Sequence, residues 1–272
     1  MSTAPSPEME TLKTRLKATW EAGDFAEIAK GIESTAEAFI ERLNITPGMK
    51  VLDVACGSGN LAVLAAKKGA DVTGIDIAEN LIEAAKGRAE AEGLDITFEQ
   101  GDAEALPYDD NSFDLVITMF GAMFAPRPDV TASELLRVCK SGGKIAMANW
   151  TPTGFAGQMF KLGGKYVPPP GMPPPVLWGV PDEVKARFGD RVSDLQMTPR
   201  MADMVFEFGP PEVVRHFQTY FGPTVMAMKA MGEENHEAFT EDLEALWTEN
   251  NTKTDGTTHA KGEYLEVIAT KR

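Results

Sequence analysis

The sequence contains little from which a metal centre, a disulfide framework or a membrane span could be built. Cys56 and Cys139 are its only cysteines, and their positions show no metal-ligand or redox spacing, so a disulfide framework is not expected. The three histidines, His216, His236 and His259, show no ligand-pair spacing, so we expect no protein metal site. No apolar run approaches the roughly 18–20 residues that a membrane-spanning helix needs.

Basic residues are also scarce. The chain of 272 residues has 26 lysines and arginines against 41 aspartates and glutamates, which gives a formal net charge of −15. This field repels phosphate backbones, and the basic residues form no run longer than the pair Lys67-Lys68, so we expect no nucleic-acid partner. Residues 1–13 are polar and lack the apolar core of a secretory signal. We therefore expect a cytoplasmic protein with no membrane partner.

Strand-like and helix-like patterns alternate through the first half of the chain. Apolar segments typical of buried strands occupy residues 50–55, 72–76, 96–100, 113–118 and 144–150. Helical periodicity lies between them, at residues 59–69, 79–92 and 129–140. This alternation is typical of βαβ units with right-handed crossovers. It predicts an α/β fold with a doubly wound, mostly parallel sheet.

The flanking segments follow other patterns. Residues 8–43 predict two helices with a break at Gly23-Asp24, where Asp24 is a plausible N-cap. Residues 151–180 are rich in glycine and proline and predict a long, turn-rich loop, either a linker or a cover over a site. The remaining elements are expected to be a strand at 201–208, helices at 210–221 and 233–249, and a last strand at 263–269.

The first predicted strand ends in an acid and a glycine turn, with the sequence Val51-Leu52-Asp53-Val54-Ala55-Cys56-Gly57-Ser58-Gly59-Asn60. A strand that stops in this way leaves room for a ligand at its carboxyl end. Residues 57–62 formally fit the dinucleotide pattern G-x-G-x-x-G/A, and Asp76 lies near the position of a ribose-binding acid. An NAD-dependent oxidoreductase is therefore one interpretation of this stretch.

Two acidic features argue against a dinucleotide. The pyrophosphate would lie over the glycine turn, where Asp53 would place a carboxylate close to it, and two like charges in a partly desolvated site repel strongly. The third strand also ends in an acidic segment, Gly101-Asp102-Ala103-Glu104, which NAD does not need. Acids at three neighbouring strand ends suit a ligand that has an ammonium, a sulfonium, a ribose diol and an adenine amine but no phosphate. S-adenosylmethionine has these groups.

The motifs, taken in order, resemble those of the class I S-adenosylmethionine-dependent methyltransferases, most closely the ubiquinone/menaquinone-type small-molecule group. The resemblance covers residues 48–150, and besides the glycine turn it rests on Gly74-Ile75-Asp76, Gly101-Asp102-Ala103-Glu104 with Leu106-Pro107, Phe113-Asp114 and Ser141-Gly142-Gly143. It implies a seven-stranded Rossmann-like sheet, S-adenosyl-L-methionine as cofactor and S-adenosyl-L-homocysteine as product. The single domain would comprise an N-terminal helical lid (1–47), a cofactor-binding core (48–150), a helical, proline-rich cap or acceptor region (151–250) and a final strand (260–272).

The same resemblance implies a role for each acid. Asp53 would bind the ammonium of the cofactor, often through water. Asp76 would accept hydrogen bonds from both ribose hydroxyls, and Asp102 would accept one from the adenine amine. Structural alternatives remain open, because Asp53 and Asp76 could be helix N-cap acids and Asp102 could be a turn former.

Smaller and apolar residues complete the implied cofactor site. They are Ala55, Cys56, Gly57, Ser58, Gly59 and Asn60 along the methionine tail, Ile77 and Leu81 against the adenine, Gly101 and Ala103 beside Asp102, Met119 near the sulfonium, and Phe25 as an aromatic lid. Core packing is an alternative for Ile77, Leu81 and Met119, and also for Phe25. Cys56 is more typical of a small packing residue than of a nucleophile, since no base neighbours it in sequence.

The acceptor side is less defined. His216, which apolar residues flank on a predicted late helix, is the candidate catalytic base, with a structural histidine as the alternative. The candidate substrate-binding residues are Phe120, Met123, Phe124, Trp150, Tyr166 and Tyr220. They predict a small apolar or aromatic acceptor, although core packing would also account for them. The Asn/Asp-Pro-Pro-aromatic signature of DNA amino-methylating enzymes does not follow the fourth strand. A cofactor-binding protein without turnover is a further alternative.

Overall fold

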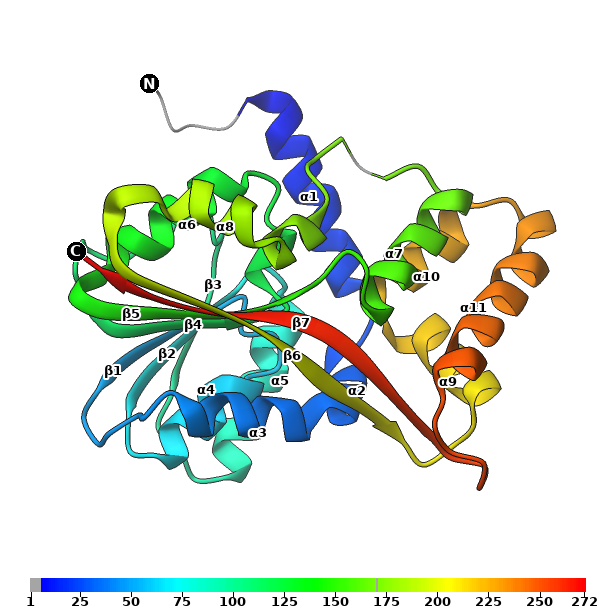
Figure 1. Ribbon diagram of the computed structural model, residues 1–272, viewed down its shortest axis with the longest axis horizontal. Helices are drawn as coiled ribbons and strands as arrows, with labels where there is room; N and C mark the ends of the chain where they lie inside the picture. The colour runs from blue at the N-terminus through cyan, green and yellow to red at the C-terminus, as the bar shows by residue number, and fades with distance from the viewer. Residues whose placement is uncertain (1–5, 170) are drawn as a thin grey trace.

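We describe residues 6–169 and 171–272 in a computed structural model of the chain (Figure 1). The predictions for residues 1–5 and for Pro170 lie outside these ranges. One seven-stranded sheet runs through the molecule in the order β3-β2-β1-β4-β5-β7-β6. Its strands are β1 (Lys50–Val54), β2 (Asp71–Asp76), β3 (Thr97–Gln100), β4 (Phe113–Met119), β5 (Cys139–Trp150), β6 (Val192–Phe206) and β7 (Thr258–Lys271).

The sheet has a mostly parallel core with an antiparallel edge. Strands β1 to β5 pair in parallel, whereas β7 lies between β5 and β6 and is antiparallel to both. The strand order reverses between β1 and β4, and ligands of doubly wound sheets bind outside the carboxyl ends of the strands at such a switch point. The predicted fold class is confirmed.

Helices cover both faces of the sheet. Figure 1 shows α3 (Glu33–Arg42), α4 (Asn60–Lys67) and α5 (Glu79–Ala91) on one face and α6 (Pro128–Val138) and α8 (Pro181–Phe188) on the other. Because both faces of the sheet are covered, every residue of β1 after Lys50 is buried, including Asp53. In the described part of the chain, no helix is long and apolar enough to cross a membrane.

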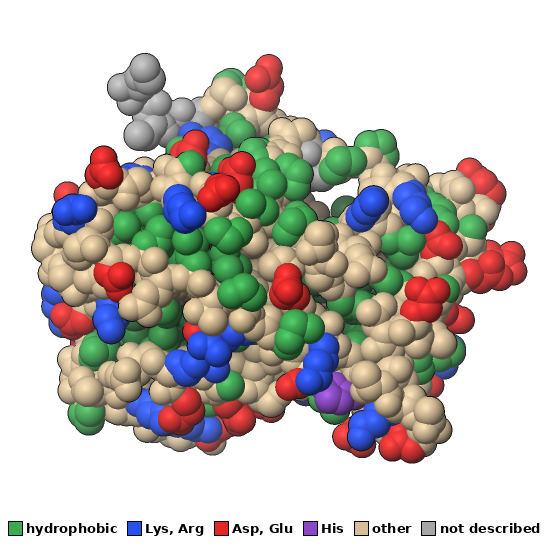
Figure 2. Space-filling model, viewed as in Figure 1, with side chains coloured by type: hydrophobic (Ala, Val, Ile, Leu, Met, Phe, Trp, Pro, Cys, Tyr) green, Lys and Arg blue, Asp and Glu red, His purple; other side chains and the backbone are tan. Residues whose placement is uncertain are grey.

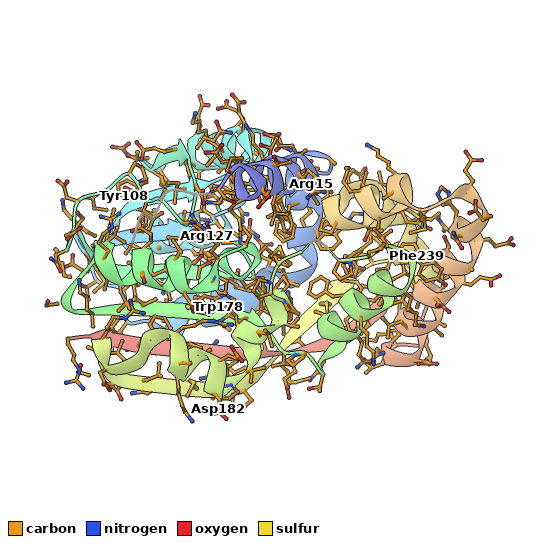
Figure 3. All side chains as sticks on the ribbon, turned by 90° about the horizontal axis from the view of Figure 1, so that it is seen from above. Arg15, Tyr108, Arg127, Trp178, Asp182 and Phe239 are labelled. Carbon is orange, nitrogen blue, oxygen red and sulfur yellow. The ribbon has the colours of Figure 1, made fainter. Side chains whose placement is uncertain are left out.

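Four further helices form a cap beside the sheet: α7 (Phe155–Tyr166), α9 (Pro210–Tyr220), α10 (Gly222–Ala230) and α11 (His236–Asn250). They bury their own apolar cluster, which includes Phe239 and Trp247. Figure 3 shows Phe239 among the cap helices and Trp178 on the side of the sheet. Short 3-10 turns lie at Lys30–Ile32, Ala122–Phe124, Pro175–Gly179, Gly189–Arg191 and Glu233–Asn235.

The N-terminal helices α1 (Pro7–Glu21) and α2 (Phe25–Ala29) join the sheet to the cap. The predicted break between them is present, and the Asp24 carboxylate accepts a hydrogen bond from the Ala26 N–H at 3.0 Å. At this break the chain touches the cap, because the Asp24 N–H donates to the Tyr220 carbonyl at 2.9 Å. A Cβ on Gly23 would lie 2.2 Å from the same carbonyl oxygen, so no larger residue fits there.

The chain beyond β5 differs from the sequence prediction. The prediction of a loop over residues 151–180 was wrong for α7, which buries Phe155, Ala156 and Leu162, because the Gly163-Gly164 pair obscured its helical period. Helices α8 and α10 were also missed. Strand β6 begins at Val192, well before the predicted start at 201, because an edge strand with many exposed residues carries little apolar signal.

Candidate functional site

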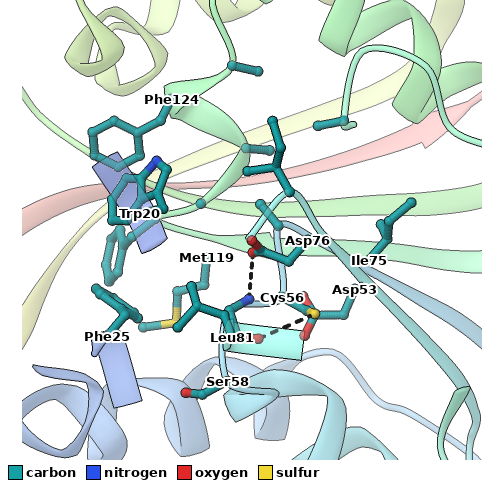
Figure 4. Close-up of a pocket in the computed structure, with 18 of the residues that line it drawn as sticks. Trp20, Phe25, Asp53, Cys56, Ser58, Ile75, Asp76, Leu81, Met119 and Phe124 are labelled. Atoms are coloured by element: carbon teal, nitrogen blue, oxygen red, sulfur yellow. Dashed lines mark hydrogen bonds between the residues drawn. The ribbon is translucent and has the colours of Figure 1, made fainter. Parts of the chain in front are cut away.

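A pocket of about 1080 Å³, including its open mouth, lies at the carboxyl ends of β1, β2 and β4 (Figure 4). With the exception of Gly59, every residue that the sequence suggested for the cofactor lines this pocket. These residues are Phe25, Asp53, Ala55, Cys56, Gly57, Ser58, Asn60, Asp76, Ile77, Leu81, Gly101, Asp102, Ala103 and Met119.

The turn after β1 needs left-handed backbone conformations. The φ angles are 55° at Ala55, 54° at Gly57 and 79° at Gly59. Gly59 serves packing, because a Cβ there would lie 3.1 Å from the Phe98 ring and 3.2 Å from the Cβ of Ala85. At Gly57 the nearest atom to an added Cβ would be on the Phe25 ring, at 3.6 Å. Gly57 therefore leaves backbone exposed to the pocket, as a ligand in close contact with the main chain requires.

Backbone strain occurs at a second place in the pocket. Phe120, which follows β4, has a φ of 56°, and this region is sparsely populated for an aromatic residue. Its ring stacks on Trp150 with centroids 3.6 Å apart and planes 5° apart. The neighbouring Gly121 is so close to the β1 turn that a Cβ would lie 2.4 Å from the Ala55 carbonyl oxygen. Strained backbone of this kind is typical of ligand sites.

Asp76 is fixed by two backbone hydrogen bonds. Its Oδ2 accepts from the Gly57 N–H at 2.8 Å and its Oδ1 accepts from the Ala78 N–H at 2.9 Å. The residue is 7% exposed, and burial raises the pKa of its carboxyl although both backbone bonds oppose the shift. Each oxygen retains a second lone pair. Each oxygen of the carboxylate can therefore accept a hydrogen bond from one hydroxyl, which fits a diol.

Asp53 is the more deeply buried acid, with 1% of its surface exposed. Its Oδ2 accepts a hydrogen bond from the Ala62 N–H in the first turn of α4 at 3.0 Å, so the acid does cap this helix. Burial is the main cause that raises the pKa of the Asp53 carboxyl well above its usual range, and the charge of Asp76 adds to the shift. An ammonium group would stabilise the ionised form, whereas a pyrophosphate would destabilise it.

Asp102 has a mixed role. Its Oδ1 accepts from the Glu104 N–H at 2.8 Å, as a turn former does. Its Oδ2 lies 2.5 Å from the Lys13 Nζ, on α1. Both Asp102 and Lys13 line the pocket. The acid therefore forms the turn and also presents its carboxylate at the pocket.

The predicted N-terminal lid contributes pocket residues that the sequence interpretation did not name. Lys13, Leu16 and Trp20 of α1 line the pocket, and their spacing of three and four residues places them on one helix face. The repeat of Leu16 and Trp20 is visible in the sequence, but it does not reveal what the face covers. The other lining residues without a predicted role are Ile32, Ala36, Leu61, Ile75, Gly121, Ala122, Ala125 and Pro126.

Three rings from different elements form what we call the aromatic wall: Trp20, Phe25 and Phe124. The ring centroids of Trp20 lie 5.0 Å from Phe124 and 6.1 Å from Phe25, in edge-on arrangements. Figure 4 shows these rings on one side of the pocket, Asp53 and Asp76 on the other, and Met119 between them. The pocket thus has an acidic side and an aromatic side.

Both cysteines are free and buried. Burial raises the pKa of the Cys56 thiol well above its usual range, and the charges of Asp53 and Asp76 add to the shift, so the thiol stays protonated. Cys56 therefore lines the pocket as a small apolar residue and is not activated as a nucleophile. Among the described residues, no three His, Cys, Asp or Glu side chains gather into a group that could hold a metal ion.

Several of the predicted acceptor residues lie outside the pocket. Phe120 and Phe124 line it. Met123 does not line the pocket and is instead buried in the main core. Trp150 supports Phe120 from behind. Tyr166 belongs to the cap, where its hydroxyl donates to a carboxylate of α11 at 2.9 Å.

His216, the candidate base, also lies outside the pocket. Its Nε2 is 3.3 Å from the Glu27 carbonyl oxygen, and its ring packs beside Phe206, Phe208 and Tyr220 of the β6–α9 region. Tyr220, a predicted acceptor residue, packs there as well. The apolar residues around His216 in the sequence belong to the cap cluster, so its position matches the structural alternative.

Known proteins resemble this chain in sequence and in fold. A family model described as a methyltransferase domain matches residues 51–143. An uncharacterized protein of Mycobacterium tuberculosis, Rv1403c, is 38% identical over 271 residues, 98% of each chain. A demethylmenaquinone methyltransferase of Renibacterium salmoninarum is 38% identical over 116 residues, which cover 43% of this chain and 47% of that protein. The solved structure of YcgJ from Bacillus subtilis aligns at a TM-score of 0.60 with 17% identity, covering 88% of this chain and 98% of that one.

The matched residues begin at β1 and end in the first residues of β5, and they include the glycine turn, Asp53, Asp76 and Asp102. The similarity to YcgJ, at low identity, shows a shared fold, and the similarity to Rv1403c extends over almost the whole chain. The domain match, the relatives and the order of the sheet agree with the family resemblance in the sequence. The chain belongs to the class I S-adenosylmethionine-dependent methyltransferases.

Proposed function

We propose that this enzyme binds S-adenosylmethionine in the pocket at the ends of β1, β2 and β4 and methylates a small apolar or aromatic molecule held against the aromatic wall. One observation carries the proposal. Three carboxylates that line the pocket, Asp53, Asp76 and Asp102, are each fixed by a backbone N–H, and three rings line the same space, opposite Asp53 and Asp76 in Figure 4.

The donor and acceptor groups of the pocket fit the cofactor. In this proposal Asp53 stabilises the ammonium, and Asp76 accepts hydrogen bonds from both ribose hydroxyls. Asp102 accepts a hydrogen bond from the adenine amine, with Ile77 and Leu81 as apolar contacts for the ring. The buried acids also oppose binding of a phosphate-bearing dinucleotide, because an anion beside Asp53 would make its charge harder to bury.

The main contribution of the protein is to align the reacting atoms. S-adenosylmethionine supplies, when bound, a methyl group that its sulfonium has already activated. The chain must place the accepting atom in line with the methyl carbon and the sulfur, and must exclude water from the space between them. Met119, Phe120 and the aromatic wall line this space and give it an apolar surface. His216 lies elsewhere, so we assign it no step.

Methyl transfer itself separates this proposal from its main alternative. The purified enzyme would be incubated with methyl-labelled S-adenosylmethionine and a panel of phenols, quinols, aromatic amines and aliphatic acids. Transfer to aromatic or apolar members supports the proposal. Binding of S-adenosylhomocysteine without transfer to any member of the panel, or to the small molecules of a cell extract, would instead indicate a cofactor-binding protein without turnover.

Trp20 is expected to affect the acceptor more than the cofactor. Replacing Trp20 with alanine removes the ring that contacts both Phe25 and Phe124, so we expect kcat/KM for an aromatic acceptor to fall about tenfold or more. The Kd for S-adenosylhomocysteine should change less than this. Trp20→Phe keeps an aromatic surface and should retain most of the activity. Steady-state kinetics measures kcat/KM for the acceptor, and calorimetry measures the Kd for S-adenosylhomocysteine. An unchanged kcat/KM for Trp20→Ala would show that the aromatic wall does not bind the acceptor.

A further inference from the structure

The lid helix α1 is attached to the cap at its C-terminal end. A Cβ on Gly222 of the cap would lie 2.1 Å from the Thr19 carbonyl oxygen, so the two backbones are in direct contact. On the side of the sheet, the Asn80 side chain of α5 donates a hydrogen bond to the Gly23 carbonyl at 3.1 Å. These contacts fix the last turn of α1 and the break that follows it. Lys13, which lies more than two turns before this end, makes a separate attachment.

Lys13 joins α1 to the loop after β3. Its Nζ lies 2.5 Å from Asp102 Oδ2 and 2.6 Å from Glu104 Oε2. The Lys13 side chain is 12% exposed and that of Glu104 is 0% exposed. An ion pair in such a shielded position is screened by salt much less than an exposed one. The contact spans from the lid to the acid that we assign to the adenine amine.

Glu104 is held in place from the side of the sheet as well. Its Oε1 accepts from the Arg127 N–H at 2.5 Å and its Oε2 accepts from the Arg127 Nε at 2.6 Å. Arg127 immediately precedes α6 and appears in Figure 3 beside the sheet, whereas Arg15 marks α1. The Glu104 carboxylate therefore keeps a fixed position independently of the lid. Lys13 is the member of this network that would leave if α1 moved.

We propose that Lys13 is a positioning residue that holds α1 closed over the adenine end of the bound cofactor. The inference rests on the proposed function, since it assumes S-adenosylmethionine in this pocket. Leu16 and Trp20 lie on the same face of α1 and cover the pocket while Lys13 is paired. Release of the cofactor at this end requires the Lys13 contacts to break. Lys13 thereby slows dissociation without touching the reacting atoms.

The closed lid and the adenine share one carboxylate. Asp102 Oδ2, which Lys13 contacts, has a second lone pair that can accept the adenine amine. A bound adenine and a closed α1 would then each keep Asp102 in the orientation that the other needs. Binding of the cofactor and closure of the lid are coupled through this residue, and coupling between two such events acts in both directions.

Lys13→Met tests the proposal, because it keeps an unbranched apolar side chain and removes the ammonium. We expect the dissociation rate of S-adenosylhomocysteine to rise about tenfold, while the association rate changes by less than about threefold. Trp20 lies in the pocket, so stopped-flow tryptophan fluorescence can follow both rates. Hydrogen exchange should show that the ligand protects α1 in the wild type and protects it much less in Lys13→Met.

Two variants control for general effects on the helix. Lys17→Met removes the same group from the same helix, but its ion pair is with Glu21 on α1 itself, so its dissociation rate should match the wild type. Lys13→Arg retains a cation and should keep dissociation slow. If Lys13→Met fails to fold, Lys13→Gln takes its place, because it also removes the ammonium but keeps a polar side chain, and it should show the same faster dissociation and the same loss of α1 protection.

The outcomes distinguish this inference from the proposed function. Failure of the wild type to bind S-adenosylhomocysteine would overturn both. Tight binding by the wild type, with an unchanged dissociation rate and unchanged α1 protection in Lys13→Met, would overturn the role of Lys13 and leave the proposed function intact. An equal increase in Lys17→Met would also overturn it, because the effect would then belong to the stability of the helix.

Discussion

Replacing Asp76 with alanine should weaken binding of S-adenosylhomocysteine by about 100-fold or more. A hydrogen bond to a charged group contributes about 1.5–3 kcal/mol, and in the proposed site Asp76 accepts two from the ribose. Each 1.4 kcal/mol is roughly a tenfold change in Kd. The substitution also removes the acceptor for the Gly57 N–H, so the glycine turn loses a contact that shapes the pocket. Isothermal titration calorimetry measures the change.

Two variants make this result specific. Asp71→Ala removes an exposed acid from the start of the same strand, far from the pocket, and should leave the affinity unchanged. Asp76→Asn keeps one acceptor oxygen and should lie between the wild type and the alanine variant. If Asp76→Ala binds as tightly as the wild type, the assignment of the ribose contact is wrong.

Asp53→Asn is expected to stabilise the protein and weaken cofactor binding. Asparagine retains an oxygen that can accept from the Ala62 N–H but carries no charge to desolvate. At neutral pH we expect the melting temperature to rise by a few degrees, since about 1 kcal/mol corresponds to roughly 2–4 °C for domains of about this size. The loss of the charge that faces the ammonium should raise the Kd for S-adenosylhomocysteine about tenfold.

The gain in stability from Asp53→Asn is expected to depend on pH. Because burial raises the pKa of Asp53 in the folded protein, the folded state binds the proton more tightly than the unfolded chain does. The stability that Asp53 contributes is thus fully present below its ordinary pKa and is lost as the pH rises through the raised value. The advantage of Asp53→Asn should grow with pH and disappear in acid.

Thermal melts across the pH range, with Asp71→Asn as the exposed control, check the stability of this variant. Calorimetry with S-adenosylhomocysteine checks its affinity. A variant that is less stable than the wild type at neutral pH would contradict the account of the buried charge. An Asp53→Asn variant that binds S-adenosylhomocysteine as tightly as the wild type would contradict the ammonium contact.

The parallel core and the acidic side of the pocket could be predicted from the sequence because the same local signals encode both. Strands buried on both faces are continuous apolar runs, and the acids that end them are next to each other in space once the strands are parallel. The ends of the predicted strands were therefore enough to identify Asp53 and Asp76 as neighbouring candidate site residues. The family resemblance added the chemical group that each acid would bind.

The lid and the cap depend on contacts that no local pattern encodes. Lys13 looks like any helical lysine until α1 is placed against the loop of Asp102 and Glu104. His216 has apolar neighbours in sequence, as a residue facing either the pocket or the cap would, and the packing of α9 decides between them. Strand β6 was predicted too short because it lies at the sheet edge, where Pro199 and exposed side chains are tolerated.

Titration calorimetry of the wild-type protein can show whether the acidic pocket selects S-adenosylmethionine over a dinucleotide. We expect S-adenosylhomocysteine to bind at one site per chain with a Kd of about micromolar order, near −8 kcal/mol, and NADH to give no binding heat at the same concentrations. Binding of NADH without binding of S-adenosylhomocysteine would contradict this expectation.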